Sequence, residues 1–392
     1  MKSKFQHVNV QKAAPFTTLI IVLVFALVLG MAFGQAPAVS AAAAQQSKMV
    51  TTKQISLAEQ KAALALWTHA AIESAPAFTM PVDSGQPGID TAGIIPAAGL
   101  STLGFSSASG KAVANSNAVA RKALAADWNA STAAALDTAE VSPEVVAEGT
   151  SQTYTSYIVN SWAPAQTIYP HKWVGRLSFK TAGGTSYCSA TSISNNNFVT
   201  AAHCVYDTTN NVWYSGWAFT PAYRNGSAPY GTFAATYCTV LTSWINLSGS
   251  YSINSWTRYD VAVCSVGKNT AGQTLNGAVG WAGRQWNYGY TRNFFDMGYP
   301  FKDTSNVVLS GAGLYLRTCT AESFQQTTDT LGMGCNWGPG ISGGPWLIGY
   351  NPNVVSGAVN SVNSGMYIGQ ANMYGIRFTD YNIVPVCTAR GC

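Results

Sequence analysis

The sequence predicts an all-β protein, built as a sandwich or a barrel of short strands. Only 9% of its 392 residues are charged, whereas Gly (37), Tyr (19) and Trp (12) are plentiful. This composition is typical of strands and turns rather than of amphipathic helices. From about residue 161 onward, short runs of β-branched and aromatic residues alternate with turns rich in Gly, Asn and Ser, as in residues 174–179 and 198–200.

The charge and hydrophobicity of the chain exclude several classes of protein. Apolar residues make up 47% of it, which excludes a disordered protein. Its net charge of +5 is spread out, without a run of Lys and Arg, so we expect no nucleic-acid partner. The chain has no HExxH motif, no P-loop and no strand-linked GxGxxG, so we expect neither a metal nor an organic cofactor.

The N-terminus has the order of a secretory signal. Three lysines precede an apolar stretch at residues 16–33, and an alanine-rich run follows, with cleavage sites after Ala41 and Ala44. We predict a signal peptide over residues 1–41 and a secreted, extracellular protein without permanent membrane association. The alternative is a permanent anchor, because about 18 apolar residues could just span a bilayer.

Residues 42–150 differ in charge and sequence pattern from residues 151–392. The first region has 6 basic and 9 acidic residues, a net charge of −3, and the second has 12 and 7, a net charge of +5. Residues 54–74 and 112–139 of the first region have helical patterns. An acidic leader before a basic body predicts a propeptide over 42–150 that acts as an intramolecular inhibitor or folding aid. An ordinary N-terminal domain or a flexible stalk is the alternative.

Cysteine usage agrees with export. An even number of cysteines in an exported chain indicates disulfides, but eight allow 105 pairings, so spacing alone selects none. No CxxC pair is present, which argues against a zinc ribbon. The eight cysteines all follow residue 187: Cys188, Cys204, Cys238, Cys264, Cys319, Cys335, Cys387 and Cys392.

The motif TAAHC (200–204) carries the first candidate catalytic residue. His171 and His203 are the histidines that lie beyond residue 150. His203 follows a strand-like run and precedes a cysteine that can fix its loop, and a general base must be held within reach of its target. We therefore predict that His203 is a general base and that His171 is a surface or packing residue.

The motif RYDVAV (258–263) carries a candidate partner for that histidine. Asp260 opens an apolar strand, where a partly buried carboxylate can accept the imidazole N–H and hold the tautomer. A turn or a helix cap is the alternative role. The competing aspartates lie mostly among polar turn residues: Asp207, Asp296, Asp303, Asp329 and Asp380.

The motif GPGISGGPW (338–346) carries a candidate nucleophile. Its glycines permit a tight backbone path that exposes the Ser342 hydroxyl and directs the N–H groups of Gly340 and Ser342 to one point, as in an oxyanion hole. A glycine turn with an incidental serine is the alternative. Gly340-x-Ser342-x-Gly344 also matches the nucleophile elbow of α/β-hydrolases, but that fold needs a histidine after the serine, and none follows residue 203.

Taken together, TAAHC, YDVAV and GISGGPW make residues ~165–392 resemble the chymotrypsin-like (trypsin-fold) serine endopeptidases. YPHKWVGRLSF (169–179) and SGGPW suggest the secreted microbial trypsin-like and glutamyl-endopeptidase-like members. The resemblance implies two packed six-stranded antiparallel β-barrels, which we assign to residues 151–270 and 271–392. It also implies an active site between them, with His203 and Asp260 from the first barrel and Ser342 from the second.

The resemblance also implies two disulfides. Cys188–Cys204 would close the histidine loop, and Cys319–Cys335 would brace the segment before Ser342. Adjacency along the chain then suggests Cys238–Cys264 and Cys387–Cys392.

Two features depart from the trypsin pattern. There, an Asp precedes the nucleophile and pairs with the new N-terminus after activation, whereas Ile341 stands here. A propeptide that blocks the cleft or assists folding is therefore more plausible than activation by N-terminal insertion. Asn336 stands six residues before Ser342, where trypsin-like enzymes have the Asp that attracts Lys and Arg.

The substrate pocket is unfamiliar. Glutamyl endopeptidases carry a histidine on the strand that lines the pocket, and the matching stretch, residues 357–361, has none. We expect neither trypsin-like nor glutamyl specificity. The residues expected to line the pocket are Asn336, Trp337, Val359 and Asn360, with a core role as the alternative for Trp337.

The sequence therefore predicts a secreted serine endopeptidase, made as a proenzyme, that cleaves protein or peptide substrates through His203, Asp260, Ser342 and an acyl-enzyme. The alternative is a catalytically silent protease-fold module for binding or adhesion. The three filled positions favour the enzyme, because inactive relatives usually lose the histidine or the serine.

Overall fold

The computed structural model describes most of the body and part of the leader. The signal peptide expected at 1–41 and the helical pattern at 112–139 lie outside it. Within the described part, no helix is both long and apolar enough to cross a membrane. The described residues are 49–83, 104–106, 153–159, 165–247, 251–351 and 356–392.

The first half of the body is a closed six-stranded antiparallel barrel. Its strands follow the order β11-β10-β5-β6-β7-β12, and pairing between β11 and β12 closes it. Its core is rich in β-branched and aromatic residues, which suit a half-buried pleated surface. Its strands are β5 (Val174–Thr181), β6 (Gly184–Ile193), β7 (Asn197–Thr200), β10 (Ser215–Pro221), β11 (Phe233–Leu241) and β12 (Ala262–Val266).

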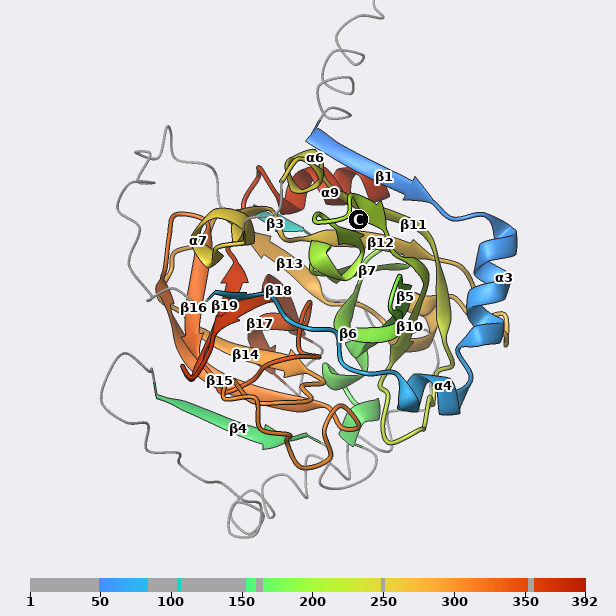
Figure 1. Ribbon diagram of the computed structural model, residues 1–392, viewed down its shortest axis with the longest axis horizontal. Helices are drawn as coiled ribbons and strands as arrows, with labels where there is room; N and C mark the ends of the chain where they lie inside the picture. Colours follow the sequence, from blue (N-terminus) through green and yellow to red (C-terminus); the bar gives the residue numbers. More distant parts are fainter. Residues whose placement is uncertain (1–48, 84–103, 107–152, 160–164, 248–250, 352–355) are drawn as a thin grey trace, which may run out of the picture. The chain divides into compact units, whose positions relative to one another are not determined.

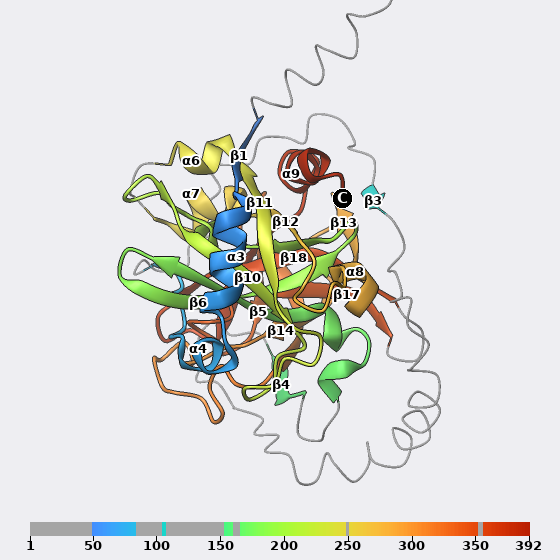
Figure 2. The same ribbon diagram turned by 90° about the vertical axis from the view of Figure 1, so that its right-hand side faces the viewer.

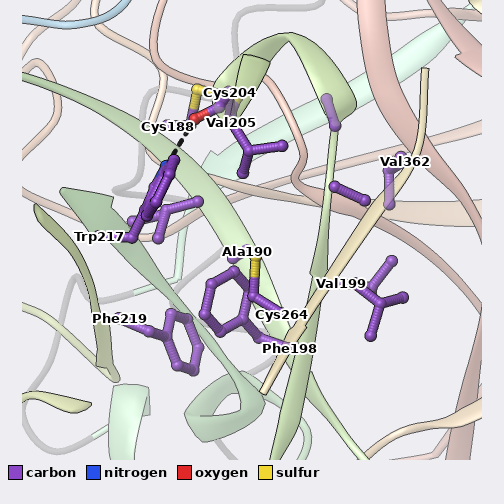
Figure 3. Packing of buried hydrophobic residues seen from close by; sticks show 14 of the residues in the cluster. Cys188, Ala190, Phe198, Val199, Cys204, Val205, Trp217, Phe219, Cys264 and Val362 are labelled. Atoms are coloured by element: carbon purple, nitrogen blue, oxygen red, sulfur yellow. Dashed lines mark hydrogen bonds between the residues drawn. A yellow bond between two sulfur atoms is a disulfide. The ribbon is translucent and has the colours of Figure 1, made fainter. Parts of the chain in front are cut away.

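Figure 3 shows part of this core. Phe198 and Phe219 pack with their ring centroids 5.2 Å apart. Trp217 donates its indole N–H to the Cys204 carbonyl over 3.3 Å, so its ring is fixed beside the Cys188–Cys204 disulfide. This side of the core therefore anchors the loop that carries His203.

The second half is a second closed antiparallel barrel. Its six strands follow the order β17-β14-β15-β16-β19-β18, and pairing between β17 and β18 closes it. Two closed barrels confirm the fold class that the resemblance implied. The strands are β14 (Asn293–Gly298), β15 (Arg317–Gln325), β16 (Thr330–Gly334), β17 (Pro345–Asn351), β18 (Ser356–Tyr367) and β19 (Asn372–Ile376).

Shorter elements connect and flank the barrels. β4 (Tyr154–Ile158) pairs with β15, and β13 (Gly283–Trp286) runs parallel to β18. β8 (Tyr206–Asp207) and β9 (Val212–Trp213) form a separate ladder. The helices are α6 (Thr242–Ile245), α7 (Ile253–Trp256), α8 (Leu275–Val279) and α9 (Ile383–Arg390). The 3₁₀ turns are η3 (Ala165–Thr167), η4 (His171–Trp173), η5 (Ala202–Cys204) and η6 (Thr257–Tyr259).

The leader adds elements to both barrels. β1 (Val50–Gln54) pairs antiparallel with β11 and extends the first barrel's sheet to seven strands. β2 (Val82–Asp83) runs parallel to β18, and β3 (Gly104–Ser106) pairs with β13. Figure 2 shows β1 and the helix that follows it lying along β11.

The leader helices differ from the single helical stretch expected at 54–74. α3 (Leu57–Leu66) and α4 (His69–Ser74) are separate. Ser56 and Glu59 form a capping box at the start of α3. Trp67 is the C-cap of α3, and Thr68 is the N-cap of α4, with its hydroxyl accepting from the Ala71 N–H over 3.3 Å. The buried Trp67 indole also donates to the Gly216 carbonyl over 2.6 Å. The helical pattern is thus interrupted at a capping threonine, and a tertiary contact fixes the residue before it.

All eight cysteines are paired. The disulfides are Cys188–Cys204, Cys238–Cys264, Cys319–Cys335 and Cys387–Cys392. These are the pairs that resemblance and adjacency suggested. Four disulfides are typical of proteins from an oxidising compartment.

Candidate active site

His203 and Asp260 lie just beyond the ends of two paired strands. His203 is in η5, after β7, and Asp260 precedes β12, which pairs with β7. The Nδ1 of His203 lies 2.7 Å from the Oδ2 of Asp260, and the His203 backbone N–H donates to Oδ1 over 2.9 Å. A carboxylate on Nδ1 sets the tautomer in which Nε2 is the free acceptor.

Asp260 is fully buried, so its carboxylate needs several donors. The third comes from the second barrel: the Ser364 hydroxyl of β18 donates to Oδ2 over 2.5 Å. Ser364 was missed by the sequence analysis, because no local motif marks it. Only the pairing of distant strands brings it to the aspartate.

The loop of Ser342 is held by close contacts that only glycine allows. Gly340 has φ +94° and Gly343 has φ +76°, values that disfavour side chains. A Cβ at Gly343 would lie 2.8 Å from the Ala201 nitrogen, two residues before His203. The Ser342 carbonyl accepts from the Ser189 N–H of β6 over 2.8 Å. The loop is therefore pressed against the first barrel beside the histidine loop.

The same loop also contacts the strand that supports Asp260. The Gly343 N–H donates to the Asn363 carbonyl over 2.9 Å, and Asn363 precedes Ser364. The three candidate residues thus lie on adjoining segments. The Ser342 Oγ and the His203 Nε2 are both buried, and neither has a hydrogen-bond partner among the described residues. Catalytic hydrogen bonds often shorten only when substrate is bound.

The proposed oxyanion donors can be oriented from their neighbours. In a trans peptide the N–H points opposite to the preceding carbonyl. The Pro339 carbonyl accepts from Phe301 N, and the Ile341 carbonyl accepts from Gly344 N. The N–H groups of Gly340 and Ser342 therefore face away from those contacts, and neither donates a hydrogen bond within the described part of the chain. They remain available to a ligand oxygen.

The four expected pocket residues are not brought together. The Asn336 side chain accepts from the Thr304 N–H over 3.1 Å, and Trp337 is buried. Val359 lies in the hydrophobic core, and Asn360 donates to the Gln285 carbonyl of β13 over 2.8 Å. That these residues line a substrate pocket stays a prediction. The segment of β18 next to the Ser342 loop begins at residue 363.

A buried acid lies behind that segment. Asn363 donates its side-chain amide to Asp296 of β14 over 2.6 Å and accepts from the Trp346 indole over 2.8 Å. Burial raises the pKa of Asp296 well above its usual range, although the bond from Asn363 opposes this. In the sequence Asp296 was a competitor of Asp260 among mostly turn aspartates, yet it lies in the core.

The leader covers the site with a segment that we call the strap, residues 75–83. The Phe78 ring stacks on the His203 ring, with centroids 6.1 Å apart. The Phe78 N–H donates to the Tyr187 carbonyl of β6 over 2.9 Å, and Met366 of β18 donates to the Pro81 carbonyl over 3.4 Å. Figure 1 shows the chain crossing from α4 to β18 between the barrels.

Both candidate side chains are buried in the structure with the strap present. His203 is 5% exposed and Ser342 is 0% exposed. Met80 is also fully buried, in the apolar cluster that contains Trp337 and Ile341. Ser342 therefore has no exposed surface in the described structure.

Two remaining histidine observations concern metal binding and packing. Cys188, Cys204 and His203 place their ligand atoms within 4.8 Å of one another. Both sulfurs belong to a disulfide, so they offer no thiolate to a metal. His171 is buried in η4, in keeping with a packing residue.

No family model and no curated protein matches the chain. Solved structures do. Protease Anisep from Arthrobacter nicotinovorans is 30% identical over 56% of this chain and 95% of its own, with a TM-score of 0.46. The thermostable serine protease AL20 from an extremophilic microorganism is 25% identical over 56% and 97%, with a TM-score of 0.45. A Glu endopeptidase in complex with MPD is 18% identical over 63% and 100%, with a TM-score of 0.49.

Proposed function

We propose, because this chain belongs to the chymotrypsin-like serine proteases, that it is a serine endopeptidase with Ser342 as its nucleophile. One observation carries the proposal. Asp260 is buried, accepts three hydrogen bonds and faces the Nδ1 of His203, while the glycine loop of Ser342 adjoins the histidine loop. An aspartate with a purely structural role would not need to bond the Nδ1 of a histidine whose loop adjoins the Ser342 loop.

The first chemical step is proton transfer with attack. The His203 Nε2 removes the Ser342 hydroxyl proton as Oγ bonds to the carbonyl carbon of a peptide. The imidazole becomes charged, and Asp260 stabilises that charge while it keeps the ring oriented. Ser364 keeps the carboxylate from rotating, so we regard it as a positioning residue.

The second contribution is electrostatic. The N–H groups of Gly340 and Ser342 would bind the oxygen that becomes negative in the tetrahedral intermediate. His203 then returns its proton to the leaving amine, and the C–N bond breaks. Water repeats the same steps on the ester of Ser342 and releases the acid product.

The leader acts as an intramolecular inhibitor in this proposal. The strap covers His203 and Ser342 in the full chain, so the full chain is a latent proenzyme. Ile341 is buried and would meet a Cβ placed on Gly298, so it packs as an apolar residue. It cannot pair with a new N-terminus, and we propose activation by loss of the strap instead.

We further propose that the protein is secreted and acts on protein or peptide substrates. Four disulfides support export, since they form in oxidising compartments. The leader would then keep the enzyme inactive until it leaves the cell, with no permanent membrane association.

The test uses the secreted protein before and after processing. A fluorophosphonate probe is added to both forms, and the adduct is located by mass spectrometry. We expect one adduct on Ser342 in the processed form and slow labelling in the full chain. Ser342→Ala should remove labelling and peptide hydrolysis, and Ser305→Ala, at an exposed loop serine, should change neither.

Two results would contradict the proposal. A processed, folded protein that is not labelled would favour a binding module of protease fold. Labelling of the full chain as fast as the processed form would remove the inhibitory role of the strap and leave the catalytic role of Ser342 intact.

A further inference from the structure

A buried arginine lies beside the strap without an acidic partner. Arg176 of β5 is 1% exposed, and its guanidinium carbon lies 3.6 Å from the Tyr187 ring centroid and 4.9 Å from that of Tyr223. The ion pairs found in the described residues are His203–Asp260 and Arg258–Asp329. Burying a charge is costly unless it is paired, so an isolated buried guanidinium calls for a function.

The hydrogen bonds of Arg176 divide between the body and the strap. Its Nη1 donates to the Gly313 carbonyl over 3.2 Å, and its Nη2 donates to the Ala75 carbonyl over 3.1 Å. Its Nε has no hydrogen-bond partner in the described part of the chain. Nε and Nη2 form one edge of the planar guanidinium. When the strap leaves, Nη2 loses its bond to Ala75, and Nε already has no partner.

Tyr187 links this arginine to the proposed catalytic centre. Its backbone bonds the strap twice, by accepting from Phe78 over 2.9 Å and donating to the Pro76 carbonyl over 3.0 Å. Its hydroxyl donates to the Tyr299 carbonyl, and a Cβ on Gly340 would lie 2.7 Å from that hydroxyl oxygen. The arginine therefore lies under the residue that borders the Gly340 loop.

The strap also indicates how far the arginine is from the reacting bond. Ala75 bonds Arg176, and Phe78, three residues later, stacks on His203. A peptide that takes the place of the strap along Tyr187, with its reacting bond at His203, passes Arg176 two to three residues away. A carboxylate there could accept from Nε and Nη2 together, which is the bidentate geometry that guanidinium groups favour.

We propose that Arg176, Tyr187 and Tyr223 form a subsite for an acidic side chain of the substrate, two to three residues from the cleaved bond on the Tyr187 side. This inference rests on the proposed function. The strap offers the arginine only the neutral Ala75 carbonyl, so an acidic peptide would bind this subsite better than the strap does. The net charge of +5 on residues 151–392 also attracts acidic peptides.

The test compares peptides that differ in one carboxylate. Processed enzyme is given fluorogenic peptides with Glu or Gln at each of the four positions on either side of the cleaved bond. We expect kcat/KM to be at least about tenfold higher for Glu at one position, two or three residues from the bond on one side. The gain should lie mainly in KM and should shrink at high salt.

Variants of Arg176 test whether this residue causes the preference for Glu. Arg176→Gln should remove the Glu preference, and Arg176→Lys should restore part of it, since lysine keeps the charge but lacks the planar edge. Lys180→Gln removes the same charge from an exposed position of the same strand and should keep the preference. Titration with the fluorophosphonate gives the concentration of folded active sites. The kcat/KM of each variant is calculated from that concentration, so poor folding does not distort it.

The outcomes separate the two proposals. Equal cleavage of Glu and Gln peptides at all positions overturns the subsite and leaves the endopeptidase proposal standing. A Glu preference that persists in Arg176→Gln also overturns it. If Arg176→Gln yields no folded protein, the wild-type Glu and Gln series decides by itself. Absence of both labelling and cleavage contradicts the endopeptidase proposal.

Discussion

The leader contacts the body through two regions that are built differently. Residues 49–74 form an edge strand and two capped helices on the first barrel, with five residues of β1 paired to β11 and Trp67 buried. The strap, residues 75–83, touches both barrels through a few separate hydrogen bonds and the side chains of Phe78 and Met80.

The difference indicates that the two regions have separate roles. Residues 49–74 hold the leader on the body, and the strap covers the candidate active site. A segment tethered next to its site has a high effective concentration and needs few contacts of its own. The strap can therefore stay weak as long as residues 49–74 remain docked. Weak local contacts also make the cover easy to displace once the tether is lost.

The largest expected effect tests the catalytic role of Ser342, in the site beside the strap. Ser342→Ala should lower kcat of the processed enzyme by about 10⁶-fold, because removal of the nucleophile leaves only binding and oxyanion contacts. Steady-state hydrolysis of a peptide measures this. Retention of more than a hundredth of the activity would mean that another residue attacks the peptide bond.

The next effect tests the docking region. Trp67→Ala should destabilise the full chain by about 3–5 kcal/mol, since it removes a buried indole and its bond to Gly216. Thermal unfolding of the full chain measures this. Leu57→Ala on the exposed face of α3 is the matched control and should change stability by about 0.5 kcal/mol or less. Equal shifts for both variants would show that the region is not docked as described.

A smaller effect tests the strap itself. Phe78→Ala should raise the fluorophosphonate labelling rate of Ser342 in the unprocessed chain by about tenfold. This is the factor expected if the variant lowers the free energy that keeps the strap in place by about 1.4 kcal/mol. Its melting temperature should stay close to that of the parent. Thr79→Ala, at the exposed neighbouring position, should leave the rate unchanged. A large fall in melting temperature with no change in labelling would reverse the roles of the two regions.

The smallest effect concerns the cap of α3. Ser56→Ala should cost about 1 kcal/mol at neutral pH. The hydrogen bond from Ser56 lowers the pKa of Glu59, so the carboxylate form stabilises the folded leader above the ordinary pKa of 4.5. This contribution is lost as pH falls through the folded-state pKa. The difference between Ser56→Ala and the parent should therefore shrink between pH 6 and pH 3, and a difference that grows would contradict the capping box.

The sequence was informative where function is encoded locally. Strand-like runs and turn residues predicted an all-β sandwich or barrel, and the family resemblance carried by three short motifs implied two barrels, which the structure has. His203 and Asp260 could be named because each sits beside an apolar strand in a short motif. Their role, like that of Ser342, stays a prediction until activity is measured.

The sequence was uninformative where contacts join distant segments. Ser364 reaches Asp260 only through the closure of the second barrel, and its own neighbours form no motif. The contacts of Asn363 with the Ser342 loop were likewise not expected, because the register of a strand cannot be seen without its pairing. Similarly, the Trp67 side chain bonds the Gly216 carbonyl of a distant strand, which no helical pattern contains.

Strand β1, the seventh strand of the first sheet, affects the mass that will be measured for the processed protein. β1 covers the Tyr237–Leu241 edge of β11, and a bare strand edge is a template for self-association. A cut that frees the strap but spares the β1–β11 ladder leaves the two fragments together without a covalent link. Such an enzyme would run as two bands on a denaturing gel, yet light scattering would report one particle with their combined mass.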